Sequence, residues 1–302
     1  KTASNDGANC YWPGGFTTTT TTVPAFDCSV HVKPLQLKCQ AGTGCVVQEL
    51  DTTTGAYTPI YDIPPVSTEP EMSRMNAFSL NPIDLKFYAS IQLVPSDETY
   101  FCRFGKGAAG VAIEFLGKLP HWTYTGAFLA DTDEFWYRSG RDIYAIKDTQ
   151  KMTETDFQDL STLKPVHTMT HERYDFGDLV VVSHKLGDRG LRKLLVSIMY
   201  GKVYILDVTS DIVPDEYLLK PKEPISEAIF GAAWVVGDRV FFAANDGSGV
   251  VEVVLTTLDV DCESPSVEVI PAGKSDEHHS NDGTTCPTSS TVVTRRMLEV
   301  QV

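Results

Sequence analysis

Apolar and polar positions alternate over short segments along most of the chain, and four of these segments share one pattern. In each, an acidic residue is followed by a run of aromatic and β-branched residues. The four leading acids recur about every fifty residues, at Asp84, Asp133, Asp178 and Asp238. Since such runs favour strands and the interval is too long for a helical repeat, the pattern predicts a β-propeller.

Each of these segments has similar neighbours. An element of small and aromatic residues precedes it, at residues 76–78, 126–128, 174–176 and 232–234. A third apolar strand follows each, as at residues 142–146 and 202–207. Small inner residues would let strands approach the axis of a ring closely. Gly177 with Asp178, and Gly237 with Asp238, are expected to form the tight turn between first and second strands.

A weaker fifth unit precedes the four, with strands expected near residues 35–39, 45–51 and 57–61. It lacks a first strand, whereas the C-terminal stretches 266–270 and 297–302 lack partners. Joining strands from both chain ends in one blade would close the ring and remove its exposed edges. The sequence therefore predicts an all-β fold, a β-propeller of five blades with six as the alternative, and disulfide-stapled, irregular termini.

A β-sandwich, or a pair of them, is the rival fold, but sandwich strands would not repeat a three-part pattern at this spacing. Residues 154–163 are the one convincing helix, and residues 188–195 are ambiguous. The expected division is a Cys- and Thr-rich N-terminal segment at 1–34, a propeller at 35–260 and a C-terminal segment at 261–302 that returns to the propeller.

Seven cysteines cluster unevenly, mostly at the irregular ends of the chain. Three local disulfide pairs are suggested, and spacing alone leaves the connectivity open: Cys10 with Cys28, Cys39 with Cys45, and Cys262 with Cys286. Cysteines in segments without a core are typical of disulfides formed in an oxidising compartment. The seventh, Cys102, is interpreted as a buried thiol, with an intermolecular disulfide as the alternative. No paired C-x-x-C spacing supports zinc.

An unbroken threonine run near the N-terminus is flanked by prolines, at Pro13 and Pro24. Clustered hydroxyls beside proline are typical of mucin-like O-glycosylation, and an extended edge strand or linker is the alternative. The candidate O-glycosylation sites are Thr17, Thr18, Thr19, Thr20, Thr21 and Thr22. Since no Asn-x-Ser/Thr sequence occurs in the chain, any glycan is expected to be O-linked.

A net charge of −15 over 302 residues argues against nucleic acid or an anionic membrane surface as the partner. No apolar run approaches the length of a membrane span. The chain begins at Lys1 rather than Met, which suggests a mature or trimmed product. The cysteines, which indicate an oxidising compartment, lead us to expect extracellular or cell-surface localisation.

None of the candidate catalytic or ligand-binding motifs has the sequence context that its chemistry requires, so we expect no catalytic, cofactor-binding or metal-binding residues. Asp131, Asp133 and Glu134 lie in the turn before an aromatic strand, where acids are ordinary. The glycine pattern of residues 105–110 has no following helix, and residues 245–249 lack the ligand pattern of a calcium loop. Glu277, His278 and His279 with Asp282 are interpreted as a solvated polar loop. A structural calcium ion remains the alternative to no cofactor.

The repeated units resemble an uncharacterised class of extracellular propeller-like domains. The resemblance spans residues 35–260 and depends on generic motifs, at residues 76–78, 87–88, 136–137, 143–148 and 49–57. It implies a secreted or cell-surface protein and supplies no catalytic residues. Together with the threonine run and the cysteines of the chain ends, the character of the chain is also similar to that of mastigoneme-type glycoprotein subunits of algal and protist surface fibres.

The leading functional hypothesis is a secreted structural glycoprotein, not an enzyme. Its propeller would be the building block of an extracellular filament or matrix, and its terminal segments would mediate self-association or contacts with other matrix glycoproteins. The first alternative is an adhesion propeller that binds carbohydrate or protein through loops on one face. The second is a calcium-dependent hydrolase or lyase, which would need acids from several blades facing a central channel.

Overall fold

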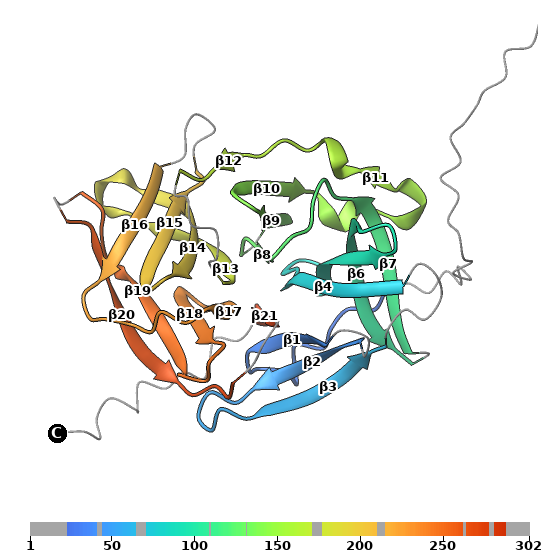
Figure 1. Ribbon diagram of the computed structural model, residues 1–302, viewed down its shortest axis with the longest axis horizontal. Helices are drawn as coiled ribbons and strands as arrows, with labels where there is room; N and C mark the ends of the chain where they lie inside the picture. Colours follow the sequence, from blue (N-terminus) through green and yellow to red (C-terminus); the bar gives the residue numbers. More distant parts are fainter. Residues whose placement is uncertain are drawn as a thin grey trace, which may run out of the picture.

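The computed structural model describes residues 23–40, 44–64, 71–108, 110–130, 132–170, 177–209, 215–261, 264–277 and 281–287. Within these ranges the chain forms β-strands and single 3-10 turns, with no α-helix. The sheets are arranged around a common centre, and β4, β8, β13, β17 and β21 lie nearest to it (Figure 1). The all-β prediction is confirmed.

One sheet joins the two ends of the chain. Its strand order is β21-β1-β2-β3, and we call it the closing sheet. Its strands are β1 (Leu35–Gln40), β2 (Gly44–Leu50), β3 (Tyr57–Ile63) and β21 (Asn281–Thr284). β21 pairs antiparallel with β1, placing Thr284 opposite Leu35.

The sequence therefore predicted closure by strands from both chain ends, but it chose the wrong C-terminal strand. Residues 266–270 belong to β20 (Ser266–Gly273), which pairs with β19 (Val250–Asp259). Residues 297–302 lie outside the described residues. The strand that completes the closing sheet is the short, polar β21.

Two further sheets follow along the chain. The second sheet contains β4 (Glu71–Leu80), β5 (Phe87–Val94), β6 (Glu98–Gly107) and β7 (Gly110–Lys118), with β11 (Gln158–Asp159) added parallel to β7. The third sheet contains β8 (Thr125–Phe128), β9 (Glu134–Ser139), β10 (Asp142–Lys147) and β12 (His167–Thr168). The main strands of each sheet are antiparallel neighbours in sequence order.

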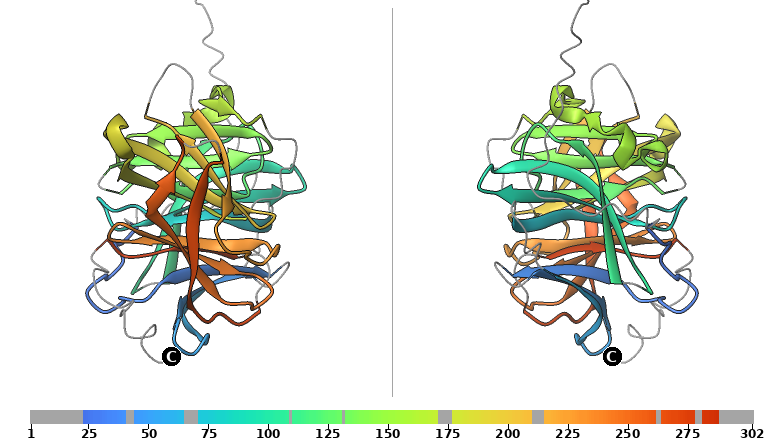
Figure 2. Two further views of the ribbon diagram at one scale, coloured as in Figure 1. Left: turned by 90° about the vertical axis from the view of Figure 1, so that its left-hand side faces the viewer. Right: turned by 90° about the vertical axis from the view of Figure 1, so that its right-hand side faces the viewer.

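The remaining strands form one eight-stranded sheet with two halves. The first half contains β13 (Leu179–Lys185), β14 (Leu191–Met199), β15 (Lys202–Asp207) and β16 (Asp215–Pro221). The second half contains β17 (Phe230–Val236), β18 (Arg239–Ala244), β19 and β20. Strand pairing joins the halves where β16 runs parallel to β20, Lys220 opposite Ser266 and Pro221 opposite Val267. Figure 2 shows β1, the neighbour of the inner strand β21, running across the short dimension of the molecule, while the outer strand β20 tilts steeply to it, as sheet twist requires.

Small residues allow the inner strands to approach one another, as the sequence predicted. A Cβ atom on Gly283 of β21 would lie 2.8 Å from both the backbone nitrogen and the carbonyl oxygen of Ala233 in β17. One on Gly177 would lie 1.7 Å from the carbonyl oxygen of Phe230. Real Cβ atoms do not approach backbone this closely, so only glycine fits at these two positions.

Bulky side chains fill the space between sheets. Tyr88 and Phe101 of the second sheet pack against Phe128 and Phe135 of the third, with ring centroids 5.1 Å (Tyr88 to Phe128) and 5.0 Å (Phe101 to Phe135) apart. All four rings are nearly or fully inaccessible to solvent. The aromatic residues of the repeated segments therefore serve as packing between neighbouring sheets.

The helix predicted for residues 154–163 is wrong. This stretch forms η2 (Glu154–Asp156), β11 and η3 (Leu160–Thr162), and η1 (Thr149–Lys151) precedes it. The side chains of Thr153 and Asp159 each cap the start of a short 3-10 turn by accepting a backbone hydrogen bond, from Asp156 N–H and Ser161 N–H, so the stretch is divided into separate turns. The ambiguous segment 188–195 is divided between η4 (Gly187–Arg189) and the start of β14.

The turn expected at Gly177 and Asp178 is also wrong. Asp84, Asp133 and Asp238 each precede the second strand of their unit, namely β5, β9 and β18. Asp178 instead precedes β13, which is the innermost strand of its half-sheet, and only 1% of its surface is exposed. The Gly-Asp dipeptide looked equivalent to that at Gly237 and Asp238, but it occupies a different place in the fold.

Two disulfides connect described cysteines. The predicted pair Cys39 and Cys45 is confirmed, and it links directly opposed residues of β1 and β2. The predicted pairs Cys10–Cys28 and Cys262–Cys286 are wrong, because Cys28 is bonded to Cys286, with their Cα atoms 5.6 Å apart. β21 brings Cys286 back to the segment before β1, a contact across the fold that local spacing cannot reveal. Cys10 and Cys262 lie outside the described residues.

Candidate functional site

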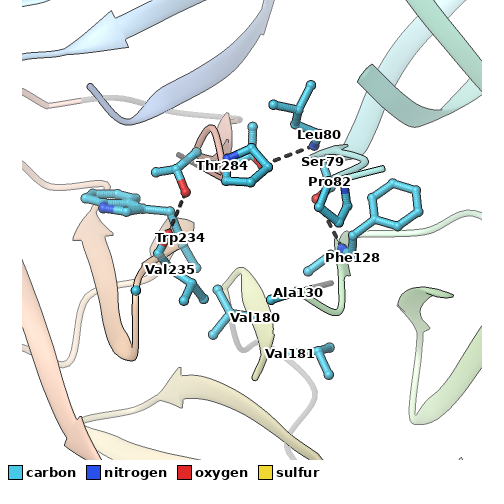
Figure 3. Close-up of a pocket in the computed structure, with 16 residues that line it drawn as sticks. Ser79, Leu80, Pro82, Phe128, Ala130, Val180, Val181, Trp234, Val235 and Thr284 are labelled. Atoms are coloured by element: carbon cyan, nitrogen blue, oxygen red, sulfur yellow. Dashed lines mark hydrogen bonds between the residues drawn. The ribbon is translucent and has the colours of Figure 1, made fainter. Parts of the chain in front are cut away.

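A pocket opens at the centre of the ring, between the inner strands. Its volume is about 230 Å³. Every sheet contributes to its wall (Figure 3), through Leu80 of β4, Phe128 of β8, Val181 of β13, Val235 of β17 and Thr284 of β21. The lining residues come from the C-terminal halves of β4, β8, β17 and β21 and from the start of β13, where Val180 and Val181 are the second and third residues. We call this cavity the axial pocket.

None of the 16 lining residues carries a charged or titratable side chain. Valine, leucine, alanine, proline and aromatic residues form most of the wall, and the indole of Trp234 points away from the opening in Figure 3. In a chain with a net charge of −15, an uncharged central opening is a local exception. The pocket therefore suits an uncharged group of a ligand.

The hydroxyl groups at the pocket are held by the neighbouring strands. Ser79 Oγ accepts a hydrogen bond from the backbone N–H of Phe128 at 3.1 Å, and Thr284 Oγ1 accepts one from Leu80 N–H at 3.1 Å. Thr285 Oγ1 donates to the carbonyl oxygen of Val235 at 2.6 Å. These bonds tie inner strands of different sheets together. None of the described residues that line the pocket with these hydroxyls is an acid or a base that could activate a nucleophile.

A buried carboxyl group lies behind the pocket wall. Asp178 Oδ2 accepts hydrogen bonds from the backbone N–H groups of Ala233 and Gly283, both at 2.9 Å. Its Oδ1 accepts from Leu179 N–H at 2.8 Å and from the hydroxyl of Thr125. Ala233 and Gly283 also line the axial pocket. Asp178 thus connects the inner strands β8, β13, β17 and β21 just beneath it.

A second buried acid, Asp282, completes this arrangement. Its Oδ2 accepts a hydrogen bond from Phe78 N–H of β4 at 3.3 Å, so the two acids together reach the inner strands of all the sheets. Burial raises the pKa of Asp178 to about 7, against hydrogen bonds that favour its carboxylate. Burial, and then the charge of Asp178, raise the pKa of Asp282 well above its usual value. We conclude that Asp282 is the partner that retains its proton.

The interpretation of Asp282 as part of a solvated polar loop is wrong, because Asp282 lies in β21 and is 2% exposed. His278 and His279 lie outside the described residues. The sequence analysis did not predict that Asp178 and Asp282 form a buried pair. The neighbouring glycines, Gly177 and Gly283, could have indicated it, because the fold requires glycine there for the close approach of backbone at the axis.

The acids before β9 are occupied by structural contacts. Asp133 Oδ1 accepts from Asn81 Nδ2 at 2.7 Å, and its Oδ2 accepts from Gln150 N–H at 3.0 Å. Glu134 pairs with Lys193 at 3.2 Å. Asp131 lies outside the described residues. Neither described acid lines the axial pocket.

The other sequence candidates occupy ordinary structural places. Residues 105–110 span the hairpin between β6 and β7, and residues 245–249 form the turn between β18 and β19. Cys102 is a free, fully buried thiol whose pKa is raised by burial. Thr17, Thr18, Thr19, Thr20, Thr21 and Thr22 lie outside the described residues.

Within the described part of the chain, no three His, Cys, Asp or Glu side chains gather in an arrangement that could hold a metal ion. Nor does any helix there have the length and apolar character that crossing a membrane requires. The axial pocket and the acid pair are therefore the features of the ring centre on which a functional proposal can be built.

Comparison with known proteins identifies no family. No protein-family model matches the chain, and no curated protein is similar to it. One solved structure with detectable similarity is that of U3-55K, with 11% sequence identity and a TM-score of 0.40. The match covers 74% of this chain and 58% of that one, so the chain spans less than two thirds of the length of U3-55K.

Proposed function

We propose that the ring is a β-propeller of five four-stranded blades that acts as an extracellular binding module. In this assignment, the closing sheet, the second sheet, the third sheet and the two halves of the eight-stranded sheet are the five blades. The equivalent position of β21, β4, β8, β13 and β17 as inner strands supports the count. The two disulfides support an oxidising, extracellular compartment.

The observation that carries the binding function is the uncharged axial pocket. Its volume of about 230 Å³ is below the roughly 300–1,000 Å³ of pockets for drug-sized ligands. A single apolar side chain of a partner protein fits a space of this size. Buried apolar anchors in such pockets supply much of the energy of protein interfaces. The lack of an acid, base or activated nucleophile in the wall supports binding rather than catalysis.

Selection of peptides from a random display library against the whole chain tests this function. Ala130 lies exposed at the pocket rim, so an Ala130→Arg substitution would place a charged chain across the opening without disturbing the core. Selected peptides should bind this variant at least about tenfold more weakly than the parent. Leu191→Arg is the matched control, because Leu191 is 70% exposed and does not line the pocket. Equal binding to both variants would exclude the axial pocket.

A second candidate is the structural glycoprotein, an extracellular filament or matrix building block. The Cys28–Cys286 disulfide supports it, because it joins the residues next to the threonine-rich N-terminal segment and the hydroxyl-rich C-terminal segment. Two such segments anchored at one place would present a joint attachment point for self-association or for other matrix glycoproteins. O-glycosylation of Thr17 to Thr22 belongs to this proposal.

Native material distinguishes the two candidates. Intact mass before and after O-deglycosylation and reduction would report the glycan load and the number of disulfides. Sedimentation over a range of extracellular salt and calcium concentrations would report assembly. A structural building block requires glycan on the N-terminal segment and concentration-dependent assembly. Unglycosylated monomers under all conditions would exclude the structural building block and leave the binding module as the remaining proposal.

A further inference from the structure

A cluster of arginine and aromatic side chains lies at the end of the ring opposite the axial pocket. It comprises Arg74, Gln92, Trp122, Tyr124 and Arg138, and we call it the Arg74 cluster. Arg74 lies near the start of β4, and Trp122 and Tyr124 immediately precede β8. The far ends of these same two strands, at Leu80 and Phe128, line the axial pocket. The cluster is therefore a separate surface.

The guanidinium group of Arg74 is held in place by its neighbours. It stacks over the Trp122 ring, 4.2 Å from the centroid, and its Nε donates to Gln92 Oε1 at 2.6 Å. Gln92 is 8% exposed and therefore itself fixed. The backbone of Trp122 is fixed as well, because Ser139 Oγ donates to its carbonyl oxygen at 2.7 Å. An arginine ordered in advance loses little conformational entropy when it binds a ligand.

The Arg74 side chain retains unused binding capacity. It is exposed, and among the described residues no carboxylate forms an ion pair with it. No residue that the structure describes accepts a hydrogen bond from its two terminal nitrogens, Nη1 and Nη2. A planar guanidinium group with both terminal nitrogens available can bind a carboxylate through two parallel hydrogen bonds, that is, in bidentate geometry.

Tyr124 provides an apolar face beside this cation. It is 51% exposed, and its ring lies edge-on to Trp122 with centroids 6.4 Å apart. The guanidinium of Arg138 lies 5.6 Å from the Tyr124 centroid, and Arg138 Nη1 donates to the carbonyl oxygen of Gly140 at 3.0 Å. The side chain of Arg138 is 3% exposed, so its positive charge underlies the surface. The cluster thus combines one accessible aromatic face with a positive local charge.

We propose that the Arg74 cluster binds a carboxylate-bearing sugar unit, such as a uronic acid residue of an acidic polysaccharide. The sugar ring would pack on Tyr124 while its carboxylate is bound by Arg74. A protein partner fits less well, because a stable protein interface needs about 800 Å² on each side. Tyr124 is the only large, substantially exposed hydrophobic side chain of this cluster. One aromatic face and one fixed arginine match a single sugar unit.

Titration calorimetry on the whole chain with a hexamer of galacturonic acid tests the assignment. Binding should weaken as salt rises, because the contact is partly ionic. Arg74→Lys keeps the positive charge but loses the bidentate hydrogen bonding to the carboxylate, and Tyr124→Ala removes the aromatic face. Each should weaken binding at least about tenfold. Arg189→Lys is the matched control, since Arg189 is paired with Asp215 and Asp261 away from the cluster. Thermal melting of each variant checks that the fold is intact.

Binding of comparison ligands determines which class of ligand the cluster prefers. A neutral maltohexaose should not bind at the concentrations used, and dextran sulfate, a sulfated chain without carboxylates, and a polyglutamate peptide should bind more weakly than the uronate hexamer. The proposal is overturned if the hexamer fails to bind at about 5 mM, or if Arg74→Lys and Arg189→Lys have the same effect. Tighter binding of the peptide or the sulfated chain would also overturn it. Ala130→Arg should leave uronate binding unchanged, so this test is independent of the axial pocket.

Discussion

The buried carboxyl group of Asp178 predicts that the protein loses stability as the pH rises from acid to neutral. Its pKa is raised from 3.8 to about 7 in the folded chain. Between these two values the folded chain binds more protons than the unfolded chain, so the free energy of unfolding falls with rising pH. The stabilisation is complete below about pH 4 and is lost by about pH 7.

The size of this effect follows from the pKa shift. A shift of about three units at roughly 1.4 kcal/mol each corresponds to about 4 kcal/mol. Asp178 is only 1% exposed, so solvent screening does not reduce this figure much. Since domains are typically stable by only about 5–15 kcal/mol, the loss would be a large part of the total. Asp282 should extend the decline above neutral pH, because its pKa is raised as well.

Urea denaturation of the parent and of Asp178→Asn at several pH values between 4 and 8 measures this contribution. Titrating groups other than Asp282, whose pKa the charge of Asp178 raises, are common to both proteins and cancel in the difference. The variant should lose the decline of about 4 kcal/mol. The variant should also be less stable than the parent at pH 4. In the parent, Asp178 Oδ1 accepts a hydrogen bond from Leu179 N–H, whereas in the variant the side-chain amide N–H group would face this donor, and two donors cannot form a hydrogen bond. Parallel pH profiles for the two proteins would refute the reasoning.

Three further predictions concern the closure of the ring and its core. Cys28→Ser with Cys286→Ser should lower the free energy of unfolding by roughly 5 kcal/mol, the loop-closure value for a sequence separation of 258; a loss under about 1 kcal/mol in chemical denaturation would contradict a role in closure. Gly283→Ala should destabilise the fold by more than about 2 kcal/mol, since its Cβ would lie 2.8 Å from Ala233 backbone atoms, and an unchanged melting temperature would count against this packing. Cys102 should react with a thiol reagent only on unfolding, because it is buried and its pKa is raised; fast labelling of the native protein would show that the thiol is accessible.

The pattern of apolar residues predicted most of the sheets, because packing between neighbouring sheets requires aromatic and β-branched residues within each short segment of the chain. Aromatic and β-branched residues at β5, β9 and β18 face other sheets, and the acid before each lies in a turn. The pattern failed at β13, where Asp178 begins an inner strand. A Gly-Asp dipeptide reads the same in an exposed turn and at a crowded axis, since only the fold decides which backbone lies beside the glycine.

The features of the ring centre could not be predicted, because each depends on contacts between residues far apart in sequence. Asp282 accepts a hydrogen bond from a residue 204 positions away, and the Cys28–Cys286 disulfide spans 258 positions. β21 is only four residues long and too polar for its pattern to mark a strand. The axial pocket gathers residues from five inner strands that are far apart in the sequence.

A crystal structure of the whole chain with a peptide selected from the display library tests the central claim most directly. The account predicts that an apolar side chain of the peptide lies in the axial pocket, in contact with Phe128, Val181 and Val235. A peptide bound elsewhere on the ring, with the axial pocket filled only by solvent, would contradict it.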